Sequence, residues 1–250
     1  MTQPLTFPVT SPTLVSIILP SRGRPAELIE SVNSILYTAV NKDKIEFLFR
    51  ADNDDLATID ACHCLMEKLP HAQLWVSPRD KGYLEMHRWT YTLAKLAQSD
   101  WLLLWNDDAH MVTPQWDHLL LHAGVASWHN VPDNYMLVCK SKNRLGCNEF
   151  MFLRKKMVDY LGHISLSPHS DNWLMRVFTA IQSVTFLPIE VDHFSQDMND
   201  KTREESVAAY ANGKLAQETL ESPQAQQAIR NDAQKLLSYI LSHNTSGVSL

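Results

Sequence analysis

The residues best suited to chemistry lie near the middle of the chain, where the apolar run Trp-Leu-Leu-Leu-Trp at 101–105 is followed by Asn106, Asp107 and Asp108. A continuous apolar run of this length is typical of a buried strand in a parallel sheet. In open α/β sheets, ligands bind beyond the carboxyl ends of the strands. Paired carboxylates there could hold Mg²⁺ or Mn²⁺ together with substrate phosphates. A solvated turn, with Asp107 capping a helix, is the alternative interpretation.

Polar or charged side chains also follow three other predicted strands. These groups are Ser21 to Arg24, Asp52 with Asp54 and Asp55, and Asp192 with His193. Each has a structural explanation when taken alone: solvated loop cations, turn residues and a hydrogen-bonded core histidine. The carboxyl ends of parallel strands share one edge of a sheet, so groups far apart in sequence can form one site there. The coincidence of four such ends favours a functional site.

The elements that would position these groups alternate between strand and helix. The predicted strands are residues 15–19, 45–49, 73–76, 101–105, 135–139, 149–153 and 184–191, the last broken by Pro188. The predicted helices are residues 25–39, 56–69 and 84–97, one beginning at Thr113-Pro114, one capped by Ser170, and a last one opening at Pro223. This alternation predicts an α/β fold with a mostly parallel sheet, helices on both faces and a C-terminal helical extension.

The composition limits the class of protein. The chain has 250 residues, of which 45% are hydrophobic, and this suits one large α/β domain. Its net charge of −6 argues against tight, non-specific binding of a polyanion. No segment approaches the ~18 uninterrupted apolar residues of a membrane span, and residues 1–13 lack the pattern of a secretory signal. The four cysteines have the spacing of neither a disulfide framework nor a zinc site. We therefore expect a cytoplasmic location.

Taken in order, these motifs resemble the family-2-like glycosyltransferases of the GT-A fold. Residues 15–22, Val-Ser-Ile-Ile-Leu-Pro-Ser-Arg, are similar to that family's first strand and nucleotide-touching loop. Residues 50–54, Arg-Ala-Asp-Asn-Asp, fall where the family has the aspartate that reads the nucleobase. Residues 82–108 resemble the stretch that leads into the Asp-X-Asp motif. Gly162, residues 170–174 with Arg176, and residues 191–193 resemble the acceptor side and the late metal-binding strand.

A narrower resemblance lies in two short stretches. Leu-Pro-Ser-Arg-Gly-Arg-Pro at 19–25 and Arg-Ala-Asp-Asn-Asp-Asp at 50–55 are similar to glycosyltransferase-like proteins found in bacteriophage genomes. This likeness implies a protein that works in the cytoplasm of the phage host.

The resemblance implies a metal-dependent transferase that moves a sugar from a UDP-sugar to an acceptor hydroxyl. The implied nucleotide-sugar contacts are Pro20, Ser21, Arg22, Arg24, Asp52, Gly82, Asn106 and Asp107. Asp108 and His193 would hold Mn²⁺ or Mg²⁺, and Asp52 would accept a hydrogen bond from the imide of uracil. Tyr83, Trp89 and Trp173 could form a flat platform for a sugar or base, or they could simply pack in the core.

The chain departs from the family at two positions. Asn106 stands where the motif normally begins with aspartate, which makes Asp108 the better candidate for the metal. Asn172 stands where inverting members carry the catalytic aspartate, and a neutral amide cannot take a proton from a hydroxyl. Asp171, one residue earlier, is the remaining carboxylate. We expect Asp171 to be the base, with a retaining mechanism that needs no base there as the alternative.

The domain organisation follows from the change to polar composition near residue 195. We expect a transferase domain at 1–194, with a nucleotide half at about 14–110 and an acceptor half at about 111–194, followed by a helical extension at 195–250. Residues Ile229, Ala233, Leu236, Leu237 and Ile240 form an apolar stripe on the last predicted helix, which we expect to pack back on the domain. The stripe could also make a dimer contact, and the oligomeric state is left open.

Two alternatives concern the acceptor. It is either a hydroxymethylated or glycosylated DNA base, or a saccharide. A local basic cluster, opposed by the overall negative charge, would favour DNA; its members are Lys140, Lys142, Arg144, Arg154, Lys155 and Lys156.

Two other classes of function remain. A nucleotidyltransferase that activates sugars would need a glycine-rich phosphate loop, yet Gly23 stands alone in a chain with seven glycines. A catalytically inactive nucleotide-sugar-binding or interaction module is the second class, and Asn106 and Asn172 motivate it.

Overall fold

The computed structural model describes residues 13–122, 135–142, 149–193 and 218–244, together with residues 204 and 208. The strands within these ranges are β1 (Val15–Pro20), β2 (Ile45–Asp52), β3 (Ala72–Ser77), β4 (Trp101–Leu104), β5 (Ala109–Met111), β6 (Met136–Ser141), β7 (Met151–Arg154) and β8 (Val184–His193). They form one sheet with the order β3-β2-β1-β4-β7-β6-β8-β5.

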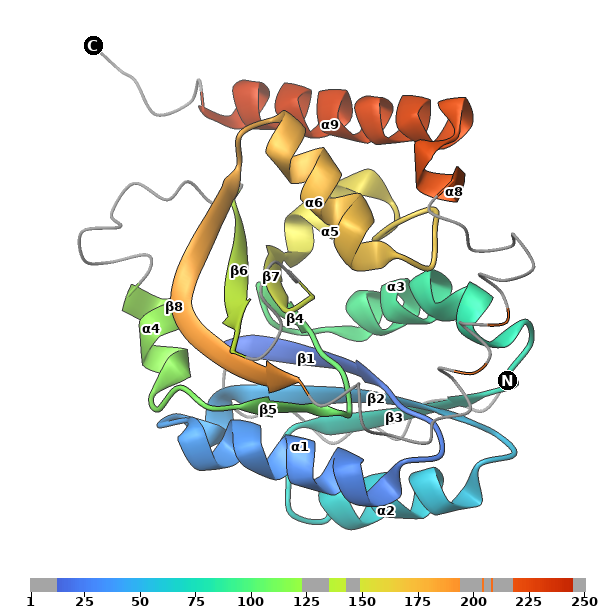
Figure 1. The fold of residues 1–250 in the computed structure, drawn as a ribbon. Helices are drawn as coiled ribbons and strands as arrows, with labels where there is room; N and C mark the ends of the chain where they lie inside the picture. Colours follow the sequence, from blue (N-terminus) through green and yellow to red (C-terminus); the bar gives the residue numbers. More distant parts are fainter. Residues whose placement is uncertain are drawn as a thin grey trace.

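Helices cover both faces of the sheet (Figure 1). They are α1 (Pro25–Thr38), α2 (Leu56–Met66), α3 (Met86–Leu96), α4 (Trp116–His122), α5 (Lys155–Leu161), α6 (Ser170–Ala180), α8 (Glu218–Glu221) and α9 (Pro223–Asn244), with 3₁₀ turns η1 (Lys42–Lys44) and η2 (Gly82–Glu85). In Figure 1, α1 and α2 lie below β1 to β3, α3, α5 and α6 lie on the other side, and α9 runs across the top. No helix within the described ranges is long and apolar enough to cross a membrane.

The sheet is parallel on one side and mixed on the other. β1 pairs in parallel with β2 and β4, and β2 with β3. β7 is antiparallel to both β4 and β6, whereas β8 is parallel to β6 and antiparallel to β5. Consequently β1, β2, β4 and β8 all run in the same direction and end at one edge. The α/β fold expected from the sequence is confirmed. The antiparallel pairings of β7 and β5 were not predicted from the sequence.

Successive residues of the central strands point into two different cores, as the pleat of a strand requires. In β1, Ile17 and Leu19 belong to the core under α1 and α2, whereas Ile18 belongs to the core under α3, α5 and α6. Burial on both faces explains why these strands are mostly apolar in sequence. The stripe on α9 completes the second core, although Leu237 remains 42% exposed. The last helix therefore packs back on the sheet domain.

Two sequence expectations near β8 were wrong. The helix predicted to begin at Thr113-Pro114 begins at Trp116, because Gln115 adopts a left-handed φ of 58° and the Thr113 hydroxyl accepts the backbone N–H of Glu190 at 2.7 Å. Pro188 does not end the late strand. β8 continues past it, and the proline lies where the pairing with β6 shifts register, which is a position where proline is tolerated in a sheet.

Candidate active site at the carboxyl edge of the sheet

The polar groups predicted to converge at the strand ends do so. After β1, the Ser21 hydroxyl donates to Asp107 Oδ2 at 2.6 Å. Arg24 bridges the carboxylate pair that follows β4, with Nη2 at 2.5 Å from Asp107 Oδ1 and Nη1 at 3.0 Å from Asp108 Oδ2. At the end of β8, His193 Nε2 lies 3.1 Å from Asp108 Oδ1.

A short strand explains how Asp108 meets His193. β5 follows the carboxylate pair at once, and its antiparallel pairing sets Ala109 opposite His193. The other ring nitrogen, Nδ1 of His193, lies 2.5 Å from Glu149 Oε2. Glu149 was not predicted as a site residue. It precedes β7, whose beginning lies at this edge only because β7 runs antiparallel to β4. We name these five residues the carboxylate cluster: Arg24, Asp107, Asp108, Glu149 and His193.

The electrostatics of this cluster follow from its burial. Asp107 and Asp108 are only 1% and 7% exposed. Burial would raise the pKa of Asp108, yet His193 and Arg24 hold it below its ordinary value. Burial also opposes a charged imidazole, but hydrogen bonds with Asp108 and Glu149 raise the pKa of His193 to about 9. In this arrangement the imidazole is a cation at neutral pH.

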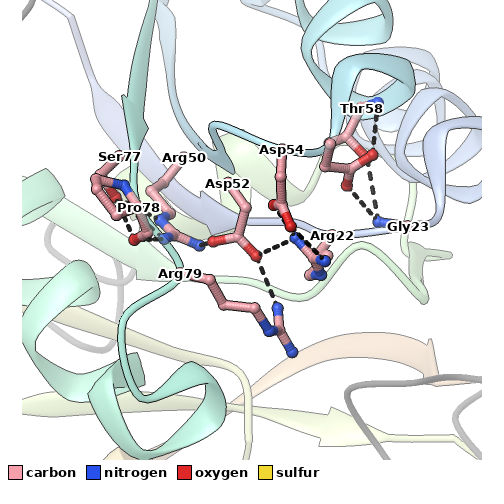
Figure 2. A network of polar contacts seen from close by, with 10 residues as sticks. Arg22, Gly23, Arg50, Asp52, Asp54, Thr58, Ser77, Pro78 and Arg79 are labelled. Atoms are coloured by element: carbon pink, nitrogen blue, oxygen red, sulfur yellow. Dashed lines mark hydrogen bonds and ion pairs between the residues drawn. The ribbon is translucent and has the colours of Figure 1, made fainter.

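A second cluster surrounds Asp52 at the end of β2 (Figure 2). Asp52 is fully buried, and its Oδ2 accepts from Nη1 of Arg22 and Nη1 of Arg79, each at 2.7 Å. Arg50 pairs with the other carboxylate oxygen. Arg22 also forms two contacts with Asp54, at 2.5 and 3.1 Å. We name these five residues the arginine cluster: Arg22, Arg50, Arg79, Asp52 and Asp54.

Arg50 is the fixed member of the arginine cluster. Its guanidinium lies 3.4 Å from the ring centroid of Trp89 and donates to the Ser77 hydroxyl and the Pro78 carbonyl. The side chain is 1% exposed. Burial lowers the pKa of Arg50 to about 10, and Asp52 opposes that shift. Arg50 and Arg79 were missed as site residues, because the sequence does not reveal that both turn toward Asp52.

The three aromatic residues considered as a platform have different surroundings. Trp89 is buried under Arg50, and Trp173 is buried with its indole N–H donating to Asp232 Oδ2 at 2.9 Å. Only Tyr83 is partly exposed, and its ring makes a T-shaped contact with His169. The two tryptophans are therefore packing residues in this structure.

Asp171 lies in the first turn of α6. Burial raises the pKa of its carboxyl, and the negative charge of Glu149 raises it further. The hydrogen bond with the backbone of Asn172 opposes this shift. Glu149 thus joins Asp171 electrostatically to the carboxylate cluster. Asn172 is exposed and lines an open groove of about 560 Å³ between α6 and the start of α9, with Arg176, Glu221 and Arg230 among its walls.

The remaining predicted residues lie at the edge without joining either cluster. Asn106 is exposed, and its backbone carbonyl accepts the Ser31 hydroxyl at 3.2 Å. Pro20 is the last residue of β1. Gly82 has a φ of 61°, which favours glycine, and its N–H donates to the Arg79 carbonyl at 2.8 Å. Gly82 therefore supports the turn that carries Arg79.

The basic cluster considered for DNA is partly engaged within the protein. The Arg154 guanidinium lies 3.9 Å from the Trp101 ring centroid, and Lys155 pairs with Asp159 at 2.8 Å. Lys140, Lys142 and Lys156 are exposed. Arg144 falls outside the described residues.

The carboxylate cluster fits a hard divalent cation by the chemistry of its donors. Carboxylate oxygens are the ligands that Mg²⁺ and Mn²⁺ prefer, and a buried carboxylate pair requires positive charge beside it. Arg24 and His193 supply that charge here. As they stand, no three His, Cys, Asp or Glu side chains in the described ranges are arranged to hold an ion. In this arrangement one oxygen of each carboxylate is paired with Arg24.

Comparison with solved structures identifies the fold. The mannosyltransferase PcManGT from Pyrobaculum calidifontis, solved with GDP-Man and Mn²⁺, is 14% identical; the match covers 97% of this chain and 78% of that one, with a TM-score of 0.59. S. aureus TarS 1–349 is 12% identical over 88% of this chain and 81% of its own, with a TM-score of 0.56. The same TarS fragment in complex with UDP is 10% identical over 95% and 93%, with a TM-score of 0.54. No family model and no curated protein matches the sequence.

Proposed function

We propose that this chain is a GT-A glycosyltransferase that moves a sugar from a UDP-sugar to an acceptor hydroxyl. One observation carries the proposal: the arginine and carboxylate clusters converge at the carboxyl edge of a sheet whose fold is shared with a mannosyltransferase solved with GDP-Man and Mn²⁺. The phosphates of a nucleoside diphosphate bind cations. A departing diphosphate requires them more strongly, because negative charge develops on it as the bond to the sugar breaks. Both requirements match the charges gathered at this edge.

The arginine cluster is the proposed site for the nucleotide. Asp52 would accept a hydrogen bond from the base imide, with Arg22 and Arg79 beside it as donors to neighbouring carbonyl or phosphate oxygens. Arg22 and Arg24 lie on the same loop after β1, so both can reach a diphosphate that crosses that loop. Arg50 holds Asp52 in place from the protein side.

The carboxylate cluster is the proposed site for the leaving group and its cation. Asp107, Asp108 and His193 would hold Mn²⁺ or Mg²⁺, which when bound supplies charge that stabilises the departing diphosphate. Binding of an ion by His193 requires the imidazole to lose a proton. Glu149, on the opposite ring nitrogen, would orient the imidazole.

Asp171 is the proposed catalytic base on the acceptor side. A carboxylate with a raised pKa takes a proton from a hydroxyl more readily, and burial with Glu149 nearby raises this one. Asn172, the residue at the position of the family's aspartate, faces the groove beside α6. Asp171 would therefore act in its place.

For the acceptor we propose a saccharide hydroxyl. Arg154 and Lys155 already have partners within the protein, which leaves a weaker basic surface for DNA. A labelled sugar transferred from UDP-sugars to saccharides, unmodified DNA and hydroxymethylated DNA separates the two acceptors. Salt-sensitive transfer to modified DNA that is lost in Lys155→Ala/Lys156→Ala would instead identify DNA.

The decisive experiment measures hydrolysis and binding of UDP- and GDP-sugars in the presence of Mn²⁺. We expect UDP-sugar hydrolysis by the wild type and a loss of about 10²–10³-fold in Asp108→Ala, because the leaving group loses its charge stabilisation. Nucleotide binding without hydrolysis in any condition would favour the inactive binding module. Release of pyrophosphate from a nucleoside triphosphate and a sugar phosphate would favour the nucleotidyltransferase.

A further inference from the structure

All four oxygens of the adjacent carboxylates after β4 already have a donor. Asp107 Oδ1 meets Arg24 at 2.5 Å, and its Oδ2 accepts from Ser21 at 2.6 Å. Asp108 Oδ2 meets Arg24 at 3.0 Å, and its Oδ1 lies 3.1 Å from His193. Arg24 contacts both carboxylates, with one nitrogen on each. The planar fork of a guanidinium suits such a bridge.

The position of Arg24 allows its side chain a second partner. Arg24 precedes Pro25, the first residue of α1, so its backbone is held at the helix start while its side chain remains 17% exposed. The side chains of Asp107 and Asp108 are much less exposed, at 2% and 7%. An anion arriving at this edge would thus meet the guanidinium before it met the acids.

We propose that Arg24 competes with the divalent cation for Asp107 and Asp108, and that a nucleoside diphosphate relieves this competition by taking Arg24 as its partner. The inference rests on the proposed function, because it assumes a diphosphate ligand and a metal at this edge. Two cations cannot share the same buried carboxylate oxygens without strong repulsion. Removal of the competitor should therefore tighten metal binding, and the diphosphate should do the same without any mutation.

The neighbouring Arg22 provides the matched control. It lies on the same loop, but its contacts are with Asp52 and Asp54. Arg22→Gln and Arg24→Gln each remove one positive charge from this edge. Only Arg24→Gln removes the bridge. Arg24→Lys keeps the positive charge but removes the planar guanidinium that bridges the two carboxylates. This variant replaces Arg24→Gln in the test if Arg24→Gln does not fold.

The test is a titration of the purified protein with Mn²⁺ alone. The electron paramagnetic resonance signal of free Mn²⁺ reports how much of the ion remains unbound. We expect weak binding by the wild type, binding at least about tenfold tighter in Arg24→Gln, and a smaller change in Arg22→Gln. Saturating UDP should tighten Mn²⁺ binding by the wild type within the ~5–150-fold range typical of coupled sites, uridine should not, and Arg24→Gln should lose most of this coupling.

Three results would overturn the proposal. They are Mn²⁺ binding in Arg24→Gln and Arg24→Lys that is no tighter than in the wild type, equal tightening in Arg22→Gln, and equal Mn²⁺ affinity of the wild type with and without UDP. The titrations without nucleotide require no transfer activity. A protein that binds Mn²⁺ as expected but hydrolyses no nucleotide sugar would disprove the proposed function while leaving the competition at Arg24 intact.

Discussion

The two charge clusters at the sheet edge balance their charges in opposite ways. In the arginine cluster, three guanidiniums meet two carboxylates, and Asp52 is enclosed by Arg22, Arg50 and Arg79. In the carboxylate cluster, three carboxylates meet one guanidinium and one imidazole. The first arrangement can accept another anion and the second another cation. A diphosphate with its metal ion supplies both.

The clusters also differ in how firmly their cations are held. Arg50 is stacked on Trp89 and bonded to Ser77 and Pro78, so it has little freedom to leave Asp52. Arg24 is held by the carboxylates of its own cluster and retains exposed surface. We infer that the arginine cluster is a rigid support, whereas the carboxylate cluster can exchange its cation.

The largest expected effect tests whether the chemistry takes place next to the carboxylate cluster. Asp171, beside Glu149, is the proposed base, so Asp171→Asn should reduce the turnover of sugar transfer by about 10²–10⁴-fold. The dissociation constant for UDP should stay near that of the wild type, because Asp171 is not among the proposed nucleotide contacts. Steady-state kinetics and calorimetry measure the two quantities.

The control for Asp171 is Asn172→Ala, the next residue on α6. It removes an exposed amide and no carboxylate, and the fall in turnover should be far smaller. Near-normal transfer by Asp171→Asn would point to another base or to a retaining reaction.

The next effect tests the rigidity assigned to the arginine cluster. Arg50→Met leaves the fully buried Asp52 without its innermost partner, so the free energy of unfolding should fall by about 3–5 kcal/mol. Arg22→Met removes a partly exposed partner while two arginines remain at Asp52, and it should cost about 0–1 kcal/mol. Urea unfolding at neutral pH measures both. Equal losses would remove the distinction between a fixed and an exposed arginine.

A smaller loss than that of Arg50→Met is expected at Asp117, a carboxylate that belongs to neither cluster. Burial would raise the pKa of Asp117, but the backbone N–H groups of Val40 and Asn41 and the Asn41 amide hold it below its ordinary value. A depressed pKa in the folded state stabilises the protein above the pKa of the unfolded chain. Asp117→Asn should therefore cost about 1–3 kcal/mol at neutral pH.

This stabilisation should disappear as the pH falls. Protonation of Asp117 removes the charge that the mutation removes, so the stability difference between Asp117→Asn and the wild type should shrink below about pH 4. Denaturant unfolding at several pH values measures it. A difference that stayed constant with pH would show that packing, not charge, accounts for the loss.

Local sequence was sufficient to predict the position of the polar groups that follow apolar strands. The mostly apolar runs that became β1, β2 and β4 are buried on both faces, and such runs are recognisable without knowledge of their partners. Their parallel direction then brought the loop after β1, Asp52 and the carboxylate pair to one edge. Both Asp107 and Asp108 were accordingly found where the sequence indicated.

The partners of those groups depended on contacts between distant parts of the chain. Glu149 reaches His193 only because β7 is antiparallel to β4, and Asp108 reaches it only because the short β5 pairs with β8. β5 has three residues, too few for a sequence pattern. Likewise, the sequence does not reveal that Arg50 in β2 is buried on Trp89.

The sequence by itself determined which ionisable groups this protein carries and that they follow strands. Only the tertiary structure decided which charge faces which, since a side chain's ionic partner is chosen by strand direction, register and burial. Arg22 and Arg24 are two residues apart and chemically identical, yet one binds Asp52 and Asp54 and the other Asp107 and Asp108. That difference arises from the folded loop, because opposite charges lower the cost of burial only when the fold brings them into contact.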